Sequence, residues 1–563
     1  MAWPTVLSTA GASLLIVLSY YANVAYHHRR KINELRKQGI PMPKEWNWFT
    51  GHLMVLQKYL DKGPQDAAVA LAMRELAREY ADTEVFLMDF WPVYPALLVL
   101  FGPKAITQVS NEYNLPKTAV VARFMKPVSG GPDLVSMNGD EWKYWRSLFN
   151  PGFSSGAMLN SVPHIVDSTL VFREKLVEMI GRGMFSLDEL TTKLTTEVIL
   201  KVTLDDDSNY QRSPNALVTA LRRICRWHSF WDPRVLMNPL RPFVQRYNGY
   251  IVNAYIRREL EQRFQEVKQE QQQNGLEGKS TSTKSVISLA LEAYLASKQD
   301  TGRAQQDKLD DGFVEYATWQ IRVFLFAGTD TTASTMVYVF YMLFKHPDWL
   351  YKLRCEHDDI FGKDPANAAG LLKQEPALLN RCKLTLAVIK ETLRLYVPAG
   401  TVREGAPGVS VTDLKGNEQP MEYCGANVLH QALHVNPRVW PRPDEFLPER
   451  FLVGPEHELY PDPAAYRPFE QGPRNCIGQT LVWNELKIAV ILVCRELEIR
   501  EAYADFDAQR EAERGLLDRL KIGVFGQPIK TAYGERAYQT DTGGLHPANG
   551  FPCYVSWAKG YEQ

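Results

Sequence analysis

The sequence lacks the features that mark several common protein classes. Its 563 residues contain no C-x-x-C pair and no N-x-S/T sequon, and the seven cysteines are scattered and odd in number. These absences argue against a disulfide framework or a zinc site and favour a reducing compartment. Lys+Arg total 64 against 65 Asp+Glu, a net charge of −1, so no nucleic-acid partner is expected. Hydrophobic residues at 45% and charged residues at 23% exclude general disorder and a polytopic membrane protein.

Charge is also missing from the first part of the chain. Ala2 to Tyr26 carry no charged side chain, and His27-His28-Arg29-Arg30-Lys31 follows directly. As a helix, this apolar segment would span roughly 37 Å, which exceeds a hydrocarbon core of about 30 Å. The sequence therefore predicts one transmembrane anchor over residues 1–30, with the rest of the chain in the cytosol. A cleaved signal peptide is the alternative, but a basic n-region and a small-x-small cleavage site are both lacking.

Residues 31–44 predict a basic and proline-bearing hinge, because Pro41 and Pro43 cannot continue a helix. The hinge either orients the body at the membrane or is a plain linker. Residues 45–563 show no internal repeat and no sharp boundary, so one mainly α-helical domain with small β-sheets is expected. Two segments interrupt it: a polar loop at 268–284 and a charged insertion at 503–531.

A long helix is predicted from Asp310 to Lys345, where His346-Pro347 ends it. Apolar residues occupy nearly all sides of its middle, so the helix should run through the interior. Its centre nevertheless reads Ala327-Gly328-Thr329-Asp330-Thr331-Thr332, and Thr and Asp are poor choices inside a helix. Either the threonines only satisfy their own backbone carbonyls, or this buried polar stretch has a function.

The strongest signal for chemistry is a glycine- and proline-bearing loop near the C-terminus, Phe469-Glu470-Gln471-Gly472-Pro473-Arg474-Asn475-Cys476-Ile477-Gly478. A strongly apolar helix should follow it. Cys476 would then lie just before a helix N-terminus, where the helix dipole, free backbone N–H groups and the nearby Arg474 favour a thiolate. A lone cysteine is more often a small buried hydrophobe, but the flanking glycines and arginine argue against that role.

This loop resembles the haem-thiolate loop of the cytochrome P-450 family, F-x-x-G-x-R-x-C-x-G, at every fixed position. Four further family motifs occur in the sequence: W-x-x-x-R, A-G-x-D-T-T, E-x-x-R and P-E-R-F, at Trp142–Arg146, Ala327–Thr332, Glu391–Arg394 and Pro448–Phe451. The resemblance covers essentially everything after residue 40. The anchor and the proline hinge resemble the microsomal, eukaryotic branch, which implies the endoplasmic reticulum membrane. The segment 533–556 looks most like filamentous-fungal members of secondary metabolism.

The resemblance implies the cytochrome P-450 fold and a b-type haem (iron protoporphyrin IX) with Cys476 as its axial thiolate, in the loop that begins at Phe469. The haem propionates would be held by Trp142, Arg146, Arg403 and Arg474. Gly328 would let the backbone approach bound dioxygen, and Thr331 with Asp330 would relay protons. Glu391, Arg394 and Arg450 would form a buried structural cluster.

The activity implied is that of a monooxygenase, which inserts one oxygen atom of the co-substrate O2 into a lipophilic small molecule. Electrons would come from an NADPH-dependent flavoprotein reductase, because no stretch of the sequence is left over for a fused reductase. Cytochrome b5 would be a further donor that no residue specifically supports. Two alternatives are a reductase-independent isomerase or dehydratase, which would not need the Asp330–Thr331 pair, and a haem-binding sensor, which should carry an output domain. The substrate should be uncharged, since the residues expected to line its site are small or apolar: Phe124, Met125, Phe324, Ala327, 399–402 and 543–545.

Overall fold

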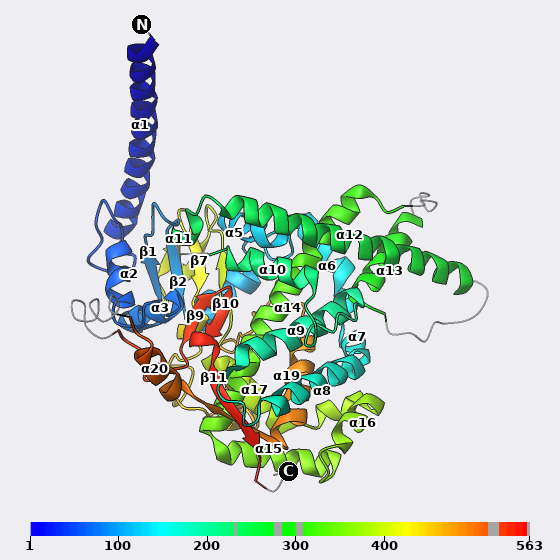
Figure 1. The fold of residues 1–563 in the computed structure, drawn as a ribbon. Helices are drawn as coiled ribbons and strands as arrows, with labels where there is room; N and C mark the ends of the chain where they lie inside the picture. The colour runs from blue at the N-terminus through cyan, green and yellow to red at the C-terminus, as the bar shows by residue number, and fades with distance from the viewer. Residues whose placement is uncertain (1, 230–232, 275–283, 300–307, 516–527, 560–563) are drawn as a thin grey trace. The chain divides into compact units, whose positions relative to one another are not determined.

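The computed structural model describes residues 2–229, 233–274, 284–299, 308–515 and 528–559, without the side chains of residues 2–11, 14 and a few others. The described chain is mainly helical with small sheets, as predicted (Figure 1). It divides into two compact units. Unit 1 comprises Met1–Gly63, Val69–Pro116 and Gly400–Asn436, and unit 2 comprises Pro64–Ala68, Lys117–Ala399 and Pro437–Gln563. Because each unit combines separated stretches, no linker composition marks a boundary in the sequence.

Unit 1 is built around a four-stranded sheet with the strand order β1-β2-β7-β4. Strand β2 pairs antiparallel with β1 and parallel with β7, and β4 closes the sheet antiparallel to β7. The runs VFLM and LLVL are buried at every residue, as expected for strands covered on both faces. The strands of unit 1 are β1 (Val85–Met88), β2 (Leu97–Leu100), β4 (Thr401–Arg403), β5 (Ser410–Thr412), β6 (Glu418–Pro420) and β7 (Gly425–Val428).

Helix α1 (Ala2–Lys37) runs through the predicted boundary between an anchor at 1–30 and a hinge at 31–44. Its C-terminal part is built into unit 1, where Ile32 and Leu35 are buried. Among the residues that the structure describes, no helix combines the length and the apolar character that a membrane crossing requires. The transmembrane span expected within residues 1–30 is therefore not confirmed.

Unit 2 is organised around helix α14 (Asp311–Lys345), the long helix that the sequence predicts. Asp310 caps its N-terminus by accepting a hydrogen bond from the Phe313 N–H at 3.0 Å, and the helix ends at His346 before Pro347. Helices α9 (Leu187–Leu204), α17 (Lys383–Leu395) and α19 (Gln479–Cys494) pack against it (Figure 1). The other long helices of unit 2 are α5 (Ala119–Ser129), α6 (Gly139–Phe149), α8 (Val162–Met179), α10 (Ala216–Arg226), α12 (Arg241–Asn274), α13 (Val286–Gln299), α15 (Pro347–Phe361) and α20 (Tyr503–Ala512).

Two small antiparallel sheets complete unit 2. One has the order β3-β11-β8, and the other is the hairpin β9-β10. Their strands are β3 (Phe185–Ser186), β8 (Leu497–Glu501), β9 (Gln539–Thr542), β10 (Gly544–Pro547) and β11 (Pro552–Trp557). The loop expected at 268–284 begins as the end of α12, and its remainder at 275–283 lies outside the described residues. The insertion expected at 503–531 begins with α20, and residues 516–527 are likewise outside.

The Glu–Arg–Arg cluster expected from the sequence is present and buried. Arg394 donates Nε and Nη2 to the two Glu391 carboxylate oxygens at 2.8 and 2.7 Å, and Arg450 Nε donates to Glu391 Oε1 at 3.2 Å. All three side chains are 0–1% exposed. Removing one partner would leave an uncompensated buried charge, which costs about 3–5 kcal/mol of stability. The cluster ties α17 to the turn at Pro448–Phe451.

Candidate functional site

The loop that carries Cys476 is held by its own backbone. The Cys476 N–H donates to the Phe469 carbonyl at 2.9 Å, and the Asn475 N–H donates to the Gly472 carbonyl at 3.2 Å. Gly472 has a φ of 79°, a left-handed conformation that glycine adopts without strain. The Phe469 ring packs edge-on against Trp483 of α19. Cys476 therefore lies three residues before the first residue of α19, as the sequence predicts.

The Cys476 side chain is exposed, yet protein atoms surround it densely enough to affect its ionisation. Desolvation raises the pKa of the Cys476 thiol, while the Gly478 backbone N–H and the Arg146 guanidinium act to lower it. On balance the pKa is raised, so the thiolate expected from the helix terminus and Arg474 is not favoured by the protein alone. A thiol in such a position needs a further positive centre, such as a metal ion, to ionise it.

Arg474 anchors the loop, and its expected contact with a haem propionate stays a prediction. Its Nη2 donates to the Met137 carbonyl at 2.6 Å and to Asn138 Oδ1 at 3.0 Å. Its guanidinium carbon lies 4.4 Å from the centre of the Trp142 ring, which is a cation–π contact. The loop and the start of α6 are thereby joined.

Arg146, one turn along α6 from Trp142, clamps the same loop. Its Nη1 donates to the Asn475 carbonyl at 3.0 Å and its Nη2 to Asn475 Oδ1 at 3.1 Å, while Nε donates to Asn150 Oδ1 at 2.8 Å. The W-x-x-x-R pair thus contacts the two residues that precede Cys476. Sequence reasoning missed Asn475 and Asn138, although an asparagine between the arginine and the cysteine was a visible signal.

The middle of α14 differs from its flanks in exposure. Residues 326–331 are partly exposed, whereas 321–325 and 332–343 are buried. A partly exposed turn in an otherwise buried, apolar helix indicates that this turn borders open space within unit 2. Thr331 Oγ1 donates a hydrogen bond to the Ala327 carbonyl at 2.8 Å. This is the bond expected if the threonine only satisfies a backbone carbonyl of its own helix. Because Thr331 is partly exposed, its side chain is also accessible for a role in catalysis.

Gly328 has a packing reason of its own. A Cβ atom at this position would lie 2.9 Å from the Ile199 side chain of α9, so a larger residue here would require Ile199 to shift. Its expected role beside dioxygen stays a prediction. Phe324 packs edge-on against Phe149 and Phe153 at ring distances of 5.0 and 5.2 Å, and its expected place at the substrate site stays a prediction.

Asp330 contacts His546, which also contacts Asp188, and sequence reasoning did not connect these three residues. Its Oδ1 lies 3.0 Å from His546 Nε2, and the His546 Nδ1 lies 2.7 Å from Asp188 Oδ1. Asp188 is in the first turn of α9 and His546 is on β10. No local pattern could have revealed a cluster drawn from three elements so far apart in the sequence.

Arg403 belongs to unit 1, on strand β4. It is fully buried, and its Nη1 donates to the Leu115 carbonyl at 3.1 Å. Its expected contact with a haem propionate stays a prediction, whereas Trp142, Arg146, Arg474 and Cys476 are brought together within unit 2.

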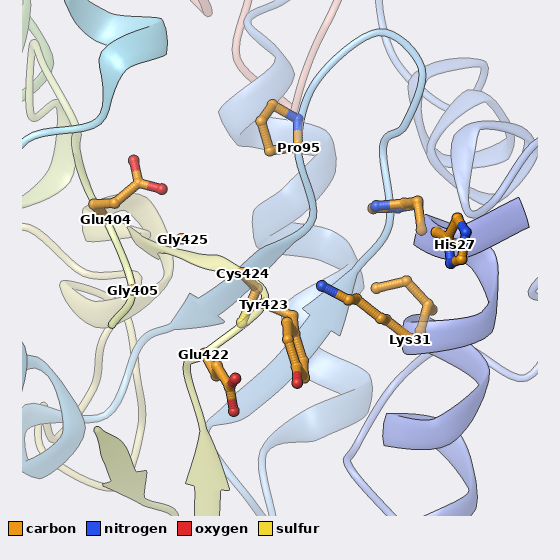
Figure 2. A pocket seen from close by; sticks show the side chains of 11 residues that line it. His27, Lys31, Pro95, Glu404, Gly405, Glu422, Tyr423, Cys424 and Gly425 are labelled. Carbon is orange, nitrogen blue, oxygen red and sulfur yellow. The ribbon is translucent and has the colours of Figure 1, made fainter. Parts of the chain in front are cut away.

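Unit 1 also contains a pocket of about 360 Å³ beside the C-terminal half of α1. Figure 2 shows the Lys31 side chain of α1 pointing toward Tyr423, and His27 and Glu422 also line the pocket. The Lys31 ammonium lies 4.3 Å from the Tyr423 ring centre. None of the residues lining this pocket is among the predicted site residues, and it mixes both charges. We therefore place the candidate site at the Cys476 loop and α14.

The residues of this site suit a haem group. Cys476 offers an accessible sulfur, Arg146 and Arg474 hold its loop rigid, and the apolar α19 follows directly. A thiolate ligand would push electron density onto a haem iron, and the partly exposed turn of α14 offers hydroxyl and carboxylate groups for proton transfer.

Comparisons with known proteins agree with this geometry. The family model "Cytochrome P450" matches residues 41–512. The chain is 37% identical to cytochrome P450 monooxygenase polC of Polytolypa hystricis, over 97% of this chain and 95% of that protein. It is 30% identical to cytochrome P450 monooxygenase acrF of Aspergillus aculeatus, over 88% and 98% respectively. The crystal structure of the cytochrome P450DA heme domain superposes with a TM-score of 0.65 at 18% identity, over 93% of this chain and 99% of that one, which supports the fold. This chain therefore belongs to the cytochrome P450 family of monooxygenases.

Proposed function

We propose that this chain is a haem-thiolate monooxygenase that inserts one oxygen atom of O2 into an uncharged, hydrophobic small molecule. Each turnover consumes substrate, O2, two electrons and two protons, and it releases the hydroxylated or epoxidised product and water. The observation that carries the proposal is Cys476: an accessible sulfur on a loop that two arginines fix, directly before an apolar helix. When bound, the haem supplies activation of O2 and oxygen transfer.

Each residue of the site has a part in this proposal. Cys476 would supply the thiolate that binds the iron of a b-type haem, and Arg146, Arg474, Trp142 and Arg403 would hold its propionates. Thr331 carries the hydroxyl that positions a proton, and Asp330 is its neighbour on the same turn of α14. The buried apolar residues on either side of this turn limit the access of water, so protons would reach the site along fixed polar groups rather than through bulk solvent.

The electrons come from an NADPH-dependent flavoprotein reductase in this proposal, with cytochrome b5 as a second donor to be tested. We propose that the protein works at the endoplasmic reticulum membrane with its haem domain in the cytosol. Exposed aromatic and apolar side chains, which favour a membrane interface, support this location. In unit 1 they are Tyr20, Tyr21, Tyr26, Trp48 and Phe49, and on helix α12 and the segment before it in unit 2 they are Met237, Leu240, Phe243, Tyr247 and Tyr250.

The substrate class is proposed from the relatives and from the residues near α14. Two of the relatives are named monooxygenases of fungi, so we propose a fungal secondary metabolite such as a polyketide or terpenoid. Ala327 and Gly543-Gly544 add no charge that would bind an ionic ligand.

One experiment tests the proposed function directly. The protein, reconstituted with haem and a flavoprotein reductase, is given isotopically labelled dioxygen, NADPH and a panel of lipophilic compounds that shift its haem spectrum on binding. Label in the product, only when NADPH and reductase are both present, is the expected result. Product formed without NADPH would instead favour the isomerase or dehydratase, and no product with any binding compound would contradict a monooxygenase.

A further inference from the structure

His546 occupies a rigid position next to the centre of α14. It lies on β10, opposite Thr540 of β9, and its side chain is 8% exposed. Thr540 Oγ1 donates to the His546 carbonyl at 3.1 Å, and Ser334 of α14 donates its hydroxyl to the Leu545 carbonyl. The backbone at His546 is therefore fixed mainly by the ladder between β9 and β10 and by Ser334 of α14, and the Thr540 hydroxyl only adds to it.

Both ring nitrogens of His546 face a carboxylate. Nδ1 lies 2.7 Å from Asp188 Oδ1 and Nε2 lies 3.0 Å from Asp330 Oδ1. Carboxylate oxygens only accept hydrogen bonds when ionised, so both contacts are satisfied at once only if both ring nitrogens carry a proton. Burial alone would lower the pKa of His546, but the two carboxylates outweigh it and hold the pKa well above its ordinary value. The two contacts and the two neighbouring carboxylates both indicate that the His546 ring is protonated as an imidazolium.

Asp330 is confined around this contact. A Cβ atom at Gly544 would lie 2.3 Å from Asp330 Oδ2, and one at Gly543 would lie 3.2 Å from Oδ1, so the hairpin turn has room for the carboxylate only because both residues are glycine. Within the described part of the chain, Asp330 Oδ2 is buried without a hydrogen-bond partner. His546 thus fixes one carboxylate oxygen and leaves the other available beside Thr331.

Three other titratable groups interact electrostatically with the carboxylates of this cluster, and each of them is neutral at physiological pH. Burial, together with the negative charge of Asp330, raises the pKa of the Cys225 thiol to about 12. Burial likewise raises the pKa of Tyr338 and of Tyr503, and the negative charge of Asp188 adds to both shifts. The described residues therefore offer His546 as the cation in direct contact with Asp330.

We infer that His546 is a positioning residue for oxygen transfer: as the counter-ion of Asp330 it holds that carboxylate in place beside Thr331, and Asp188 in turn fixes the His546 ring. The inference rests on the proposed function, in which Asp330 and Thr331 serve proton delivery. The Asp188 side chain is 20% exposed, whereas His546 is 8% exposed. The cluster therefore connects the partly exposed start of α9 to the middle of α14 through side chains that can carry protons. A C-terminal hairpin would thereby control how efficiently NADPH consumption yields product.

A double-mutant cycle tests this inference in the reconstituted enzyme. His546→Gln keeps a hydrogen-bonding side chain but loses the charge, so haem content and the substrate-induced spectral shift should be retained. Product formed per NADPH should fall about tenfold, the effect of losing one charge-assisted hydrogen bond. Asp330→Asn should show a loss at least as large. Because His546 acts through Asp330, the double variant should be no worse than Asp330→Asn alone.

Thr540→Val is the matched control, since it removes a hydrogen bond from the same hairpin without touching the imidazole. It should stay within about twofold of wild type, a difference that corresponds to the low end for one neutral hydrogen bond. Unchanged coupling in His546→Gln, or losses that add in the double variant, would overturn the inference.

A second measurement does not depend on turnover. Histidine-labelled protein in the diamagnetic reduced carbon monoxide complex is titrated by NMR, and the His546 signal is identified by its loss in His546→Gln. The midpoint should lie above the ordinary value of about 6.5 in wild type and fall in Asp330→Asn and in Asp188→Asn. A wild-type midpoint at or below the ordinary value overturns the inference. If the wild type consumes no NADPH with any substrate, the proposed function fails, and this titration alone decides whether His546 is the counter-ion of Asp330.

Discussion

Arg29 and Asp89 form an ion pair inside unit 1, with side chains that are 1% and 0% exposed. Arg29 Nη2 also donates to the carbonyls of Phe49 and Trp91 at 3.0 and 2.7 Å, and His28 Nε2 lies 2.9 Å from Asp89 Oδ1. The C-terminal half of α1 is thus part of the folded body. An anchor that ended at residue 30 would separate His28 and Arg29 from Asp89. An anchor that ended before His28 would leave this cluster within the folded body.

Two truncations should therefore behave differently. Removal of residues 1–26 keeps Arg29 and His28, so the thermal midpoint and the haem spectrum should match the full chain. Removal of residues 1–30 leaves Asp89 buried without its cation and should cost about 3–5 kcal/mol in unfolding free energy. Denaturant unfolding of both proteins decides between these outcomes, and Arg29→Ala in the full chain should reproduce the larger loss. Equal stability of the two truncated proteins would contradict a structural role for this ion pair.

Stability should also depend on pH through Asp89. Burial raises the pKa of this carboxyl, but hydrogen bonds from His28 and Trp46 and the nearby Arg29 outweigh it, so the pKa is lowered on balance. A lowered pKa means that the contribution is present above the unfolded value, about 3.9, and is lost as the pH falls through the folded value. The difference in unfolding free energy between wild type and Asp89→Asn should be largest near neutral pH and shrink in acid. A difference that grows in acid would contradict the sign.

Cys476→Ala should abolish the haem-thiolate signature. Without the sulfur, the protein should retain little haem, and the reduced carbon monoxide complex should lack the thiolate-type Soret band. Cys494→Ala is the matched control, because Cys494 is buried at the end of α19 and should not affect the spectrum. Retention of the band in Cys476→Ala would mean that another cysteine is the ligand.

Arg146→Ala should weaken haem retention without unfolding the protein. The substitution removes two hydrogen bonds from the loop residue Asn475, next to Cys476, and one to Asn150. Loss of a partner that orients a metal ligand typically costs about 10–100-fold in affinity, and the rate of haem transfer to apomyoglobin measures it. Lys143→Ala, on the exposed side of α6, serves as the control and should leave the rate unchanged. Equal rates in the two variants would remove Arg146 from the clamp.

Sequence patterns anticipated the parts of this molecule that depend on local rules. The ends of α14 follow from Asp310 and Pro347, and the position of Cys476 follows from the glycines around it. Helical spacing places Glu391 and Arg394 on one helix face, whereas their burial with Arg450 is what the family resemblance implies. The rest depends on contacts between distant segments. Asp188, Asp330 and His546 meet because three elements pack together, and Arg474 bonds to Met137 and Asn138, which lie more than 300 residues earlier in the chain. Neither set of contacts can be predicted from a local sequence pattern.

Thr331 remains the sharpest test of the proposed chemistry. Its hydroxyl donates to the Ala327 carbonyl, which alone would explain a threonine at this position. If the hydroxyl also positions a proton during oxygen transfer, Thr331→Ala should keep the substrate-induced spectral shift and consume NADPH, but yield about tenfold to a hundredfold less product. The lost oxygen should appear as hydrogen peroxide.

Thr331→Ser keeps a hydroxyl and should lie near wild type in product formed per NADPH. Thr335→Ala is the control, because Thr335 makes the same kind of hydrogen bond to the Thr331 carbonyl one turn further along the buried part of α14. If Thr331 only satisfied a carbonyl, the two alanine variants should show the same coupling as wild type. A loss of coupling confined to Thr331→Ala, with peroxide accounting for the missing product, would separate proton positioning from helix structure.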